Sequence, residues 1–413
     1  MEGAVSLFFA LIFTVNMIYQ VTVVDLSPLQ LVLVGTLLEL TVFVFEVPTG
    51  IVADVYSRRL SILIGYGLMG AGFVVEGAVP QFGAVLAGQV LWGLGYTFTS
   101  GATQAWIADE VGDERAGQAF MRGAQVGAAG GLVGIPLGVA LGSLDIRLPI
   151  LVGGVLFVGL AGALAFVMPE RGFTPTPAGE RDSWRTMAHT LRDGVRLVRG
   201  RTVLLTFVAI SIFYGLYSEG LDRLWTAHLL EDFTFPMWGG FKPVVWFGAI
   251  NVTSALLSMG GTEIVRRRVA VQDQRRVVSV LFAANALMVA AILVFALATP
   301  FGVAVIALLG FKVLRSVGGP LMSAWINPHI ESGVRATVFS MMGQVDAISQ
   351  VAGGPVLGLI GSRVSIRAAI VASGIVLSPV LLLYARILRR ILRRIKHQED
   401  ERAAPAAAPV GPQ

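Results

Sequence analysis

The sequence predicts an all-α integral membrane protein whose twelve transmembrane helices form two pseudo-symmetric six-helix bundles. The first observation is composition: 55% of the 413 residues are hydrophobic and 14% are charged, whereas soluble domains carry about 25% charged residues. The second is that charge-free segments of the roughly 20 residues needed to cross a bilayer recur along the chain. The third is an internal repeat. Helices are expected because unpaired backbone groups are costly in hydrocarbon and no alternating barrel pattern occurs.

Turn and charge signals separate the twelve expected spans. Pro80-Gln81 and Thr299-Pro300, for example, divide two apolar runs that are each too long for one helix. The expected ranges are 3–24, 28–52, 60–79, 82–108, 117–141, 147–168, 202–226, 241–264, 277–298, 301–326, 336–361 and 365–388.

The distribution of basic residues predicts the orientation. Most of the 31 lysines and arginines fall in alternate connections, including Arg58, Arg115, segment 171–201, segment 266–276 and the tail 386–402. Cytoplasmic loops carry such an excess, so both termini are predicted to be cytoplasmic. The preference for arginine over lysine suggests a GC-rich bacterial genome, and hence the bacterial inner membrane. A monomer is expected.

Four regions are expected along the chain. Residues 1–169 would form the first six-helix bundle and residues 202–388 the second. The connection 170–201 begins as a Pro/Gly linker and continues as a basic amphipathic helix suited to the membrane surface. The tail 389–413 is basic and then compositionally disordered, and its basic part is suited to anionic lipid headgroups.

The two halves repeat one another at an offset of about 220 residues. AWIAD at 105–109 matches AWINP at 324–328, and Pro136 falls opposite Pro355. An even number of spans in each copy gives both copies the same orientation, which predicts an axis along the membrane normal. Chance similarity between glycine-rich helices is the alternative.

The stretch EVPTGIVADVYSRR, residues 46–59, interrupts the apolar sequence between the second and third spans. Its Gly50, Asp54, Arg58 and Arg59 resemble the loop signature of the major facilitator superfamily, commonly G-x-L-A-D-x-x-G-R-K/R. The chain departs from it at Ser57, where glycine is usual. A degenerate copy lies at 260–268, and the twelve spans extend the resemblance over the whole chain.

This resemblance implies that the loop acts as a gate. It places the second span against the eleventh, so Asp54 would clasp the inner end of span eleven near Arg335 while the cytoplasmic side is shut, with Glu46 joining the network. The alternative is that Arg58 and Arg59 serve only to enforce topology.

Ionisable residues at mid-membrane depth are the next candidates, because they are costly there and functional by default. Counting along the helices places Glu39, Lys312, Arg315 and Asp346 at similar depths. We expect them to form a neutral cluster near the interface of the halves, with Asp222 as a further candidate. The cluster would be either a set of structural ion pairs or a proton or substrate site.

A glycine and proline pattern in the fifth span, Gly131, Gly134, Pro136 and Gly138, resembles the signature of family members that export by antiport. Helix packing through small residues explains it equally well. SGATQAWIADE in the fourth span also resembles bacterial drug-efflux members. Glu76 receives little functional weight, because the resemblance makes the third span peripheral.

The resemblance implies a central cavity lined by spans one, four, seven and ten. Aromatic walls with few polar groups suit amphipathic compounds, although each residue alone fits packing as well. The candidate substrate contacts are Asn16, Tyr19, Gln20, Trp92, Tyr96, Tyr214 and Tyr217.

The predicted function is proton-coupled efflux of small amphipathic molecules by alternating access, driven by the proton gradient without a cofactor. A proton-coupled importer is the first alternative, because the fold does not set direction. A membrane-embedded enzyme or a scaffold is the second. The chain has no cysteine, its four histidines are dispersed and no nucleotide-binding loop occurs, so we expect neither an enzyme nor a metal site. Nucleic acid is not an expected partner.

Overall fold

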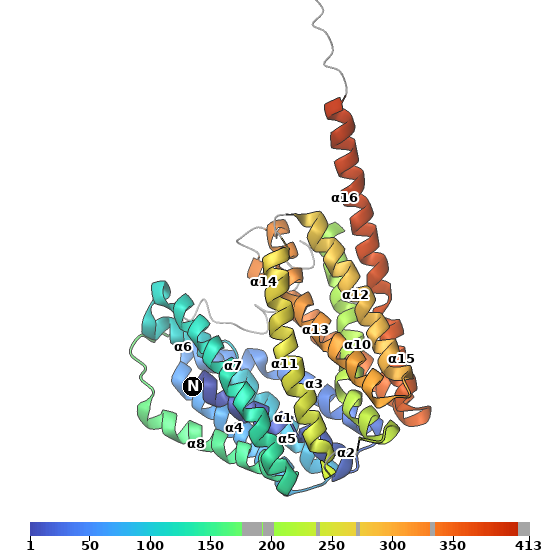
Figure 1. Ribbon diagram of the computed structural model, residues 1–413. Helices are drawn as coiled ribbons and strands as arrows, with labels where there is room; N and C mark the ends of the chain where they lie inside the picture. Colours follow the sequence, from blue (N-terminus) through green and yellow to red (C-terminus); the bar gives the residue numbers. More distant parts are fainter. Residues whose placement is uncertain (176–191, 193–201, 237–239, 270–272, 331–334, 404–413) are drawn as a thin grey trace, which may run out of the picture.

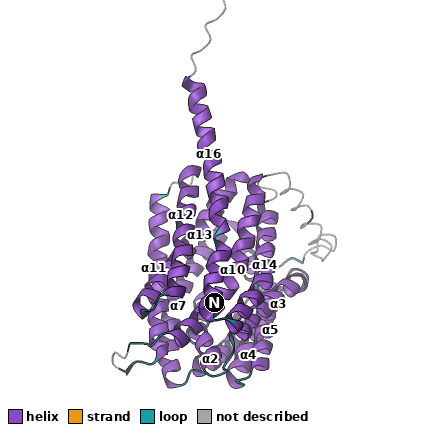
Figure 2. Ribbon diagram, turned by 90° about the vertical axis from the view of Figure 1, so that its right-hand side faces the viewer, coloured by secondary structure: helices purple, strands orange, loops and turns teal. Residues whose placement is uncertain are grey.

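The computed structural model describes residues 1–175, 192, 202–236, 240–269, 273–330 and 335–403 (Figure 1). Within these ranges the regular elements are helices (Figure 2). The expected amphipathic helix of the 170–201 connection and the expected disorder of 404–413 fall almost entirely outside them.

Helices from the first part of the chain pack against one another as the N-terminal half. Contacts join α1 to α7 and α8, and α4 to α5 and α8. The members are α1 (Glu2–Phe13), α2 (Asn16–Thr22), α3 (Pro28–Val55), α4 (Arg58–Ala78), α5 (Phe82–Thr99), α6 (Ala102–Val111), α7 (Asp113–Leu144) and α8 (Leu148–Val167).

The remaining helices pack as the C-terminal half. Contacts join α10 to α14 and α15, and α12 to α13, α15 and α16. The members are α10 (Thr202–Asp232), α11 (Pro243–Arg268), α12 (Gln274–Leu297), α13 (Phe301–Ile326), α14 (Arg335–Arg363), α15 (Ile366–Leu377) and α16 (Pro379–Ala403), with a 3₁₀ turn at Asn327–His329.

Two seams join the halves, one between α3 and α14 with α10, the other between α7 and α11. Leu29 N–H donates to Ser362 Oγ at 2.8 Å in the first. Lys242 Nζ donates to the Ser143 carbonyl at 2.6 Å in the second. Both bonds lie at the ends of the helices away from Arg58, Arg115, Arg266 and Arg335. We call the end with these arginines the arginine-rich end, and the other the opposite end (Figure 1).

Burial changes along α3. Near the opposite end Leu31, Val32 and Val34 are fully buried, whereas Leu40 and Val44, toward the arginine-rich end, are 44% and 39% exposed. Further along the same helix Thr49 and Ala53 are buried again, so only one side of α3 is exposed there. Helices α7 and α11 lie together at the opposite end and separate toward the arginine-rich end (Figure 1). The halves are closed at one end and diverge toward the other.

Ten helices or helix pairs of the described chain are long and apolar enough to cross a membrane. The expected spans 82–108 and 336–361 are not among these ten, although α5 with α6 and α14 occupy them. The span count of twelve and the cytoplasmic location of the termini therefore stay predictions.

Three expected spans are interrupted helices. The twelfth breaks between α15 and α16, at Ser378. The first breaks between α1 and α2, at Thr14 and Val15. The fourth breaks between α5 and α6, where Gly101 adopts a φ of +72°, a conformation that costs glycine little. Such breaks free backbone groups inside a membrane and are tolerated where protein or a cavity satisfies them.

The structure also places two helix ends differently from the expectation. The second span was expected to end at 52, whereas α3 continues to Val55 and contains Pro48, at the loss of one helical hydrogen bond. The last helix continues past 388 to Ala403, so the tail begins as an extension of α16 beyond the bundle (Figure 1).

Candidate functional site

The C-terminal half contains an ion pair between two of its helices. Arg315 Nη1 on α13 donates to Asp222 Oδ1 on α10 at 2.6 Å. The side chains are 37% and 42% exposed, so the pair joins the helices without being sealed off. Arg315 also lies near the ring of Tyr217, at 6.0 Å.

A cavity of about 290 Å³ adjoins this pair. Its volume is near the lower limit of small-molecule sites, about 300–1,000 Å³. Residues of α10, α11 and α13 line it with both apolar and charged groups. They are Leu221, Asp222, Trp225, Ser254, Leu308, Phe311, Lys312, Arg315 and Ser316.

Lys312 gives the cavity an excess of positive charge. Its ammonium lies 4.2 Å from the ring centroid of Trp225, a cation–π contact. Within the described part of the chain Lys312 forms no ion pair, because Asp222 bonds to Arg315. Two cations and one anion therefore line an otherwise largely apolar cavity, which suits a molecule with an apolar body and an anionic group.

A second ion pair lies at the seam between the halves. Arg223 Nε donates to Glu219 Oε1 at 2.9 Å, and the two side chains are 15% and 5% exposed. Gly35 of α3 covers the pair so closely that a Cβ there would lie 1.5 Å from Glu219 Oε1. The N-terminal half thus closes directly over a buried salt bridge of the C-terminal half.

The four residues expected to cluster, Glu39, Lys312, Arg315 and Asp346, form no ion pair with one another in the described part of the chain. Arg315 pairs with Asp222, while Asp346 accepts from Gln350 on its own helix at 2.8 Å. Glu39 and Asp346 lie within electrostatic range of one another. Depth along a helix does not specify which face a side chain occupies, so the depth count could not predict these partners.

A buried polar cluster in the N-terminal half centres on Glu76, which is 0% exposed. Oε1 accepts from Asn16 Nδ2 at 2.9 Å and from Gln20 Nε2 at 2.7 Å, while Oε2 accepts from Gln89 Nε2 at 3.2 Å. Tyr19 donates to the Glu76 carbonyl at 2.7 Å. The sequence analysis assigned Glu76 little weight. Its apolar, glycine-rich neighbourhood gave no sign of the four polar groups that other helices supply.

The side chains expected to contact substrate differ in how deeply they are buried. Asn16, Tyr19 and Gln20 belong to the Glu76 cluster and are buried, as is Tyr217. Trp92 packs against Phe9, Phe13 and Phe73, and Tyr214 donates to Asn285 at 2.5 Å. Tyr96, at 47% exposed, is the accessible member of the set.

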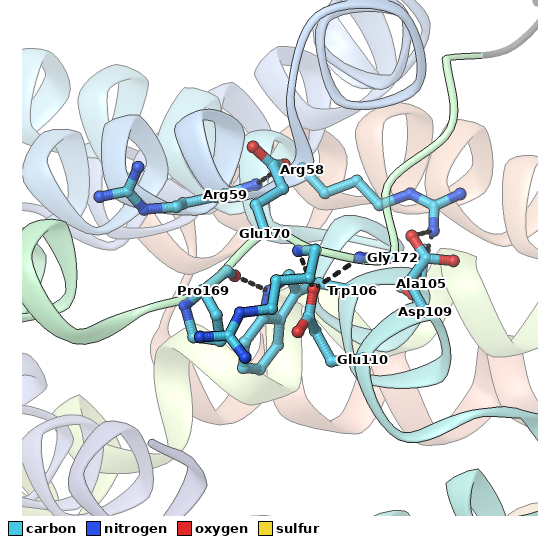
Figure 3. Close-up of polar contacts among 10 residues, drawn as sticks. Arg58, Arg59, Ala105, Trp106, Asp109, Glu110, Pro169, Glu170 and Gly172 are labelled. Carbon is cyan, nitrogen blue, oxygen red and sulfur yellow. Dashed lines mark hydrogen bonds and ion pairs between the residues drawn. The ribbon is translucent and has the colours of Figure 1, made fainter.

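The arginines of the 46–59 stretch bind within their own half (Figure 3). Arg58 forms an ion pair with Asp109 and donates to the Ala105 carbonyl at 3.1 Å. Arg59 donates to the Ala165 carbonyl. These contacts tie the beginning of α4 to α6 and to the end of α8.

Glu170 binds the start of α4 (Figure 3). It accepts from Arg59 N–H at 2.9 Å and from Ser57 Oγ at 2.7 Å, and Ser57 caps the helix by accepting from Leu60 N–H. A carboxylate is favourable at a helix N-terminus. Ser57, where the family signature has glycine, therefore has a capping role.

The expected gate latch stays a prediction. Arg335 donates to the carbonyls of Asn327 and Ile330 in its own half, and Glu46 accepts from Ser100 Oγ at 3.2 Å. Asp54 has an interaction of its own. The structure, with its arginine-rich end divergent, does not present the closed state in which the latch would form.

The glycines of the fifth-span pattern pack against α1. A Cβ at Gly134 would lie 2.4 Å from the Leu7 carbonyl, and one at Gly138 would lie 2.7 Å from the Leu11 carbonyl. Gly131 has open space around it, and Pro136 lies inside α7. Close helix packing accounts for two of the four residues.

Comparisons with known proteins agree with this architecture. A family model described as Major Facilitator Superfamily matches residues 3–343. The chain is 21% identical over 360 residues to an uncharacterized MFS-type transporter, YxaM, of Bacillus subtilis (strain 168), covering 87% of this chain and 88% of that protein.

Solved transporters share the fold at low identity. A crystal structure of the nucleoside transporter NupG superposes with a TM-score of 0.71 at 14% identity, covering 95% of this chain and 97% of that one. A POT family transporter in complex with a thioalcohol-conjugated peptide gives 0.67 at 11% identity, covering 95% and 94%.

Proposed function

Because the chain belongs to the Major Facilitator Superfamily, we propose that it is a secondary active transporter of the bacterial inner membrane that exports small amphipathic molecules in exchange for protons. Two observations carry this proposal: the charged cavity of the C-terminal half, lined by α10, α11 and α13, and the closure of the two halves at one end only. The proton gradient would supply the energy, and no cofactor is required.

The direction of opening supports an alternating-access mechanism. The halves are joined at the opposite end by the bonds of Leu29 with Ser362 and of Lys242 with Ser143. Helices α7 and α11 separate toward the arginine-rich end (Figure 1). If that end is cytoplasmic, as the arginine distribution predicts, this conformation faces inward. An exporter would load its substrate in this state.

The cavity is the proposed substrate site. Trp225 and Phe311 supply apolar walls. The two cations of the lining, Lys312 and Arg315, outnumber its one anion, Asp222. Within the amphipathic class, molecules with an anionic group are therefore favoured. Arg315 would exchange its partner between Asp222 and the substrate.

Glu39 and Asp346 are proposed coupling carboxyls. Both are partly buried, and both lie near the interface between the halves, where rocking of one half against the other changes their neighbours. A carboxyl whose neighbours change also changes its proton affinity. That change is the minimum required to couple substrate movement to proton movement.

Import by proton symport is the second candidate. The surplus positive charge of Lys312 suits an anionic metabolite as well as an amphipathic drug. The same cavity would then load from the opposite end. Only the direction of the coupled proton flux separates the two functions.

The test uses proteoliposomes that contain a pH dye, with lipophilic cations and organic anions added on one side. Proton movement opposite to the compound is the expected result, with loss of the signal in Glu39→Gln or Asp346→Asn. Proton movement with the compound would establish symport. Radiolabelled flux without any proton movement would refute proton coupling.

A further inference from the structure

Glu76 lies in the most completely enclosed polar site of the described chain, and the proposed transport cycle does not use it. It lies near the end of α4, with zero exposed surface. An isolated ionised carboxylate is very costly to bury, and in practice such a group is paired or neutralised. The helices around Glu76 show which of these applies.

No helix packed against α4 brings a basic residue to Glu76. Helices α2, α5 and α8 contain no charged residue at all, and α1 contains only Glu2. The ionisable groups of α3 and α6, which also touch α4, are all acids. They are Glu39, Glu46, Asp54, Asp109 and Glu110.

In the described part of the chain none of the nearby cations forms an ion pair with Glu76. Arg147, which directly precedes α8, acts electrostatically on Tyr19. Arg58 and Arg59 lie about 25 Å away along α4 at 1.5 Å per residue, and they bind Asp109 and the Ala165 carbonyl. Arg223 of α10 acts on Glu76 at longer range, but its ion pair is with Glu219. Tyr19, the titratable neighbour from α2, donates to the Glu76 carbonyl and not to its carboxyl group.

We propose that Glu76 is a proton-binding site, occupied in this conformation, and that it forms the coupling centre of the N-terminal half. Its Oε1 accepts from Asn16 and Gln20, so the proton would reside on Oε2. The Gln89 amide, whose oxygen has no partner, can rotate by half a turn and accept that proton.

A proton fits this site better than a metal cation. Sodium would need several oxygen ligands, whereas Asn16 and Gln20 direct amide hydrogens at Oε1, and only Gln89, once rotated, would offer an amide oxygen. The site also adjoins the break between α1 and α2, because Asn16 is the first residue of α2. Movement at this break would change the contacts of Asn16 and Gln20 together, and so release the proton.

Occupancy is tested by infrared spectroscopy of the purified full-length protein at neutral pH. When the spectrum of Glu76→Gln is subtracted from that of the wild type, the difference should contain the carbonyl band of a protonated carboxyl group. Glu39→Gln is the control, and its spectrum should still contain the band of Glu76. An unchanged band in Glu76→Gln overturns the proposal. If that variant does not fold, Gln89→Leu replaces it. Because Gln89 would accept the proton of Glu76, its replacement should shift the carbonyl band of the protonated Glu76. A shift of this band supports the proposal, and an unshifted band overturns it.

Sodium is tested on the same samples by thermal unfolding in sodium and potassium chloride. Equal midpoints are expected for wild type. A stabilisation by sodium that is lost in Glu76→Gln would assign the site to a metal cation and overturn the proposal. Proton occupancy does not depend on the proposed transport function, whereas the coupling role does. Failure of the liposome assay would leave the infrared result standing.

Discussion

In the N-terminal half the central buried acid lies among amides, whereas in the C-terminal half each central pair joins an acid to an arginine. Glu76 has three amide donors, while Glu219 and Asp222 have Arg223 and Arg315. Two halves with related sequences thus neutralise membrane-embedded charge differently. A proton can leave Glu76 without stranding a basic side chain. In an ion pair, by contrast, each charged group needs a new charged partner when the pair breaks. The difference suggests a division of labour, with a proton bound in the core of the N-terminal half and the charged substrate in the C-terminal half. Glu39 and Asp346 would couple the two at the interface between the halves.

The largest expected effect comes from breaking the buried pair at the seam. Arg223→Ala leaves Glu219 buried and unpaired, and we expect a loss of about 3–5 kcal/mol in stability. Unfolding of the purified protein in detergent measures it. Arg266→Ala is the matched control, because its pair with Glu263 is largely exposed and no change is expected. Equal behaviour of the two variants would contradict the account of the seam.

Removal of the unpaired cation of the cavity comes next. Lys312→Gln should weaken binding of an anionic compound roughly ten- to hundredfold, because a charge-assisted hydrogen bond contributes about 1.5–3 kcal/mol. Binding titrations on the solubilised protein measure the change. Arg276→Gln, at an exposed position, should bind as wild type does. Undiminished affinity in Lys312→Gln would exclude this lysine from the substrate site.

A methyl group added to α3 tests the same seam from the N-terminal half. Gly35→Ala places a Cβ against the Glu219 carboxylate, and overpacking of this kind costs about 1–3 kcal/mol. Both stability and transport should fall, because the opposite end can no longer close fully. Gly67→Ala on α4, where the added carbon meets nothing within 4 Å, should leave both intact. A fully active Gly35→Ala would show that this close approach is dispensable.

The smallest effect on stability is expected at Glu76. Glu76→Gln replaces a protonated, uncharged carboxyl group by an amide of nearly the same shape, so the free energy of unfolding should stay within about 0.5 kcal/mol of wild type. Glu219→Gln, which strands Arg223, should be clearly less stable. The same unfolding assay compares them. Equal destabilisation would mean that Glu76 is ionised and paired in the folded protein.

Much of the architecture follows from hydropathy and charge. The apolar runs correctly located the helices, and the matched Pro136 and Pro355 lie inside α7 and α14, the two helices that reach across the seams. Span two also meets span eleven, as the resemblance implied. These features depend on composition over many residues, which a single sequence records well.

The partners of individual side chains could not be predicted in the same way. Depth along a helix placed Arg315 and Asp346 at one level, but the rotation of α13 brings Arg315 to Asp222. The Glu76 cluster draws on Asn16, Gln20 and Gln89 from separate helices, and no local pattern connects them. The break at Thr14 and Val15 has no proline or glycine signal. All three features depend on how helices pack.

One liposome experiment tests the division of labour directly, by comparing substrate exchange with pH-driven accumulation in the same vesicles. We expect Glu76→Gln to keep exchange and lose accumulation, because substrate still binds while position 76 can no longer take up or release a proton. Lys312→Gln should lose both. Accumulation by Glu76→Gln at the wild-type level would contradict the account, because the N-terminal carboxyl would then have no part in coupling.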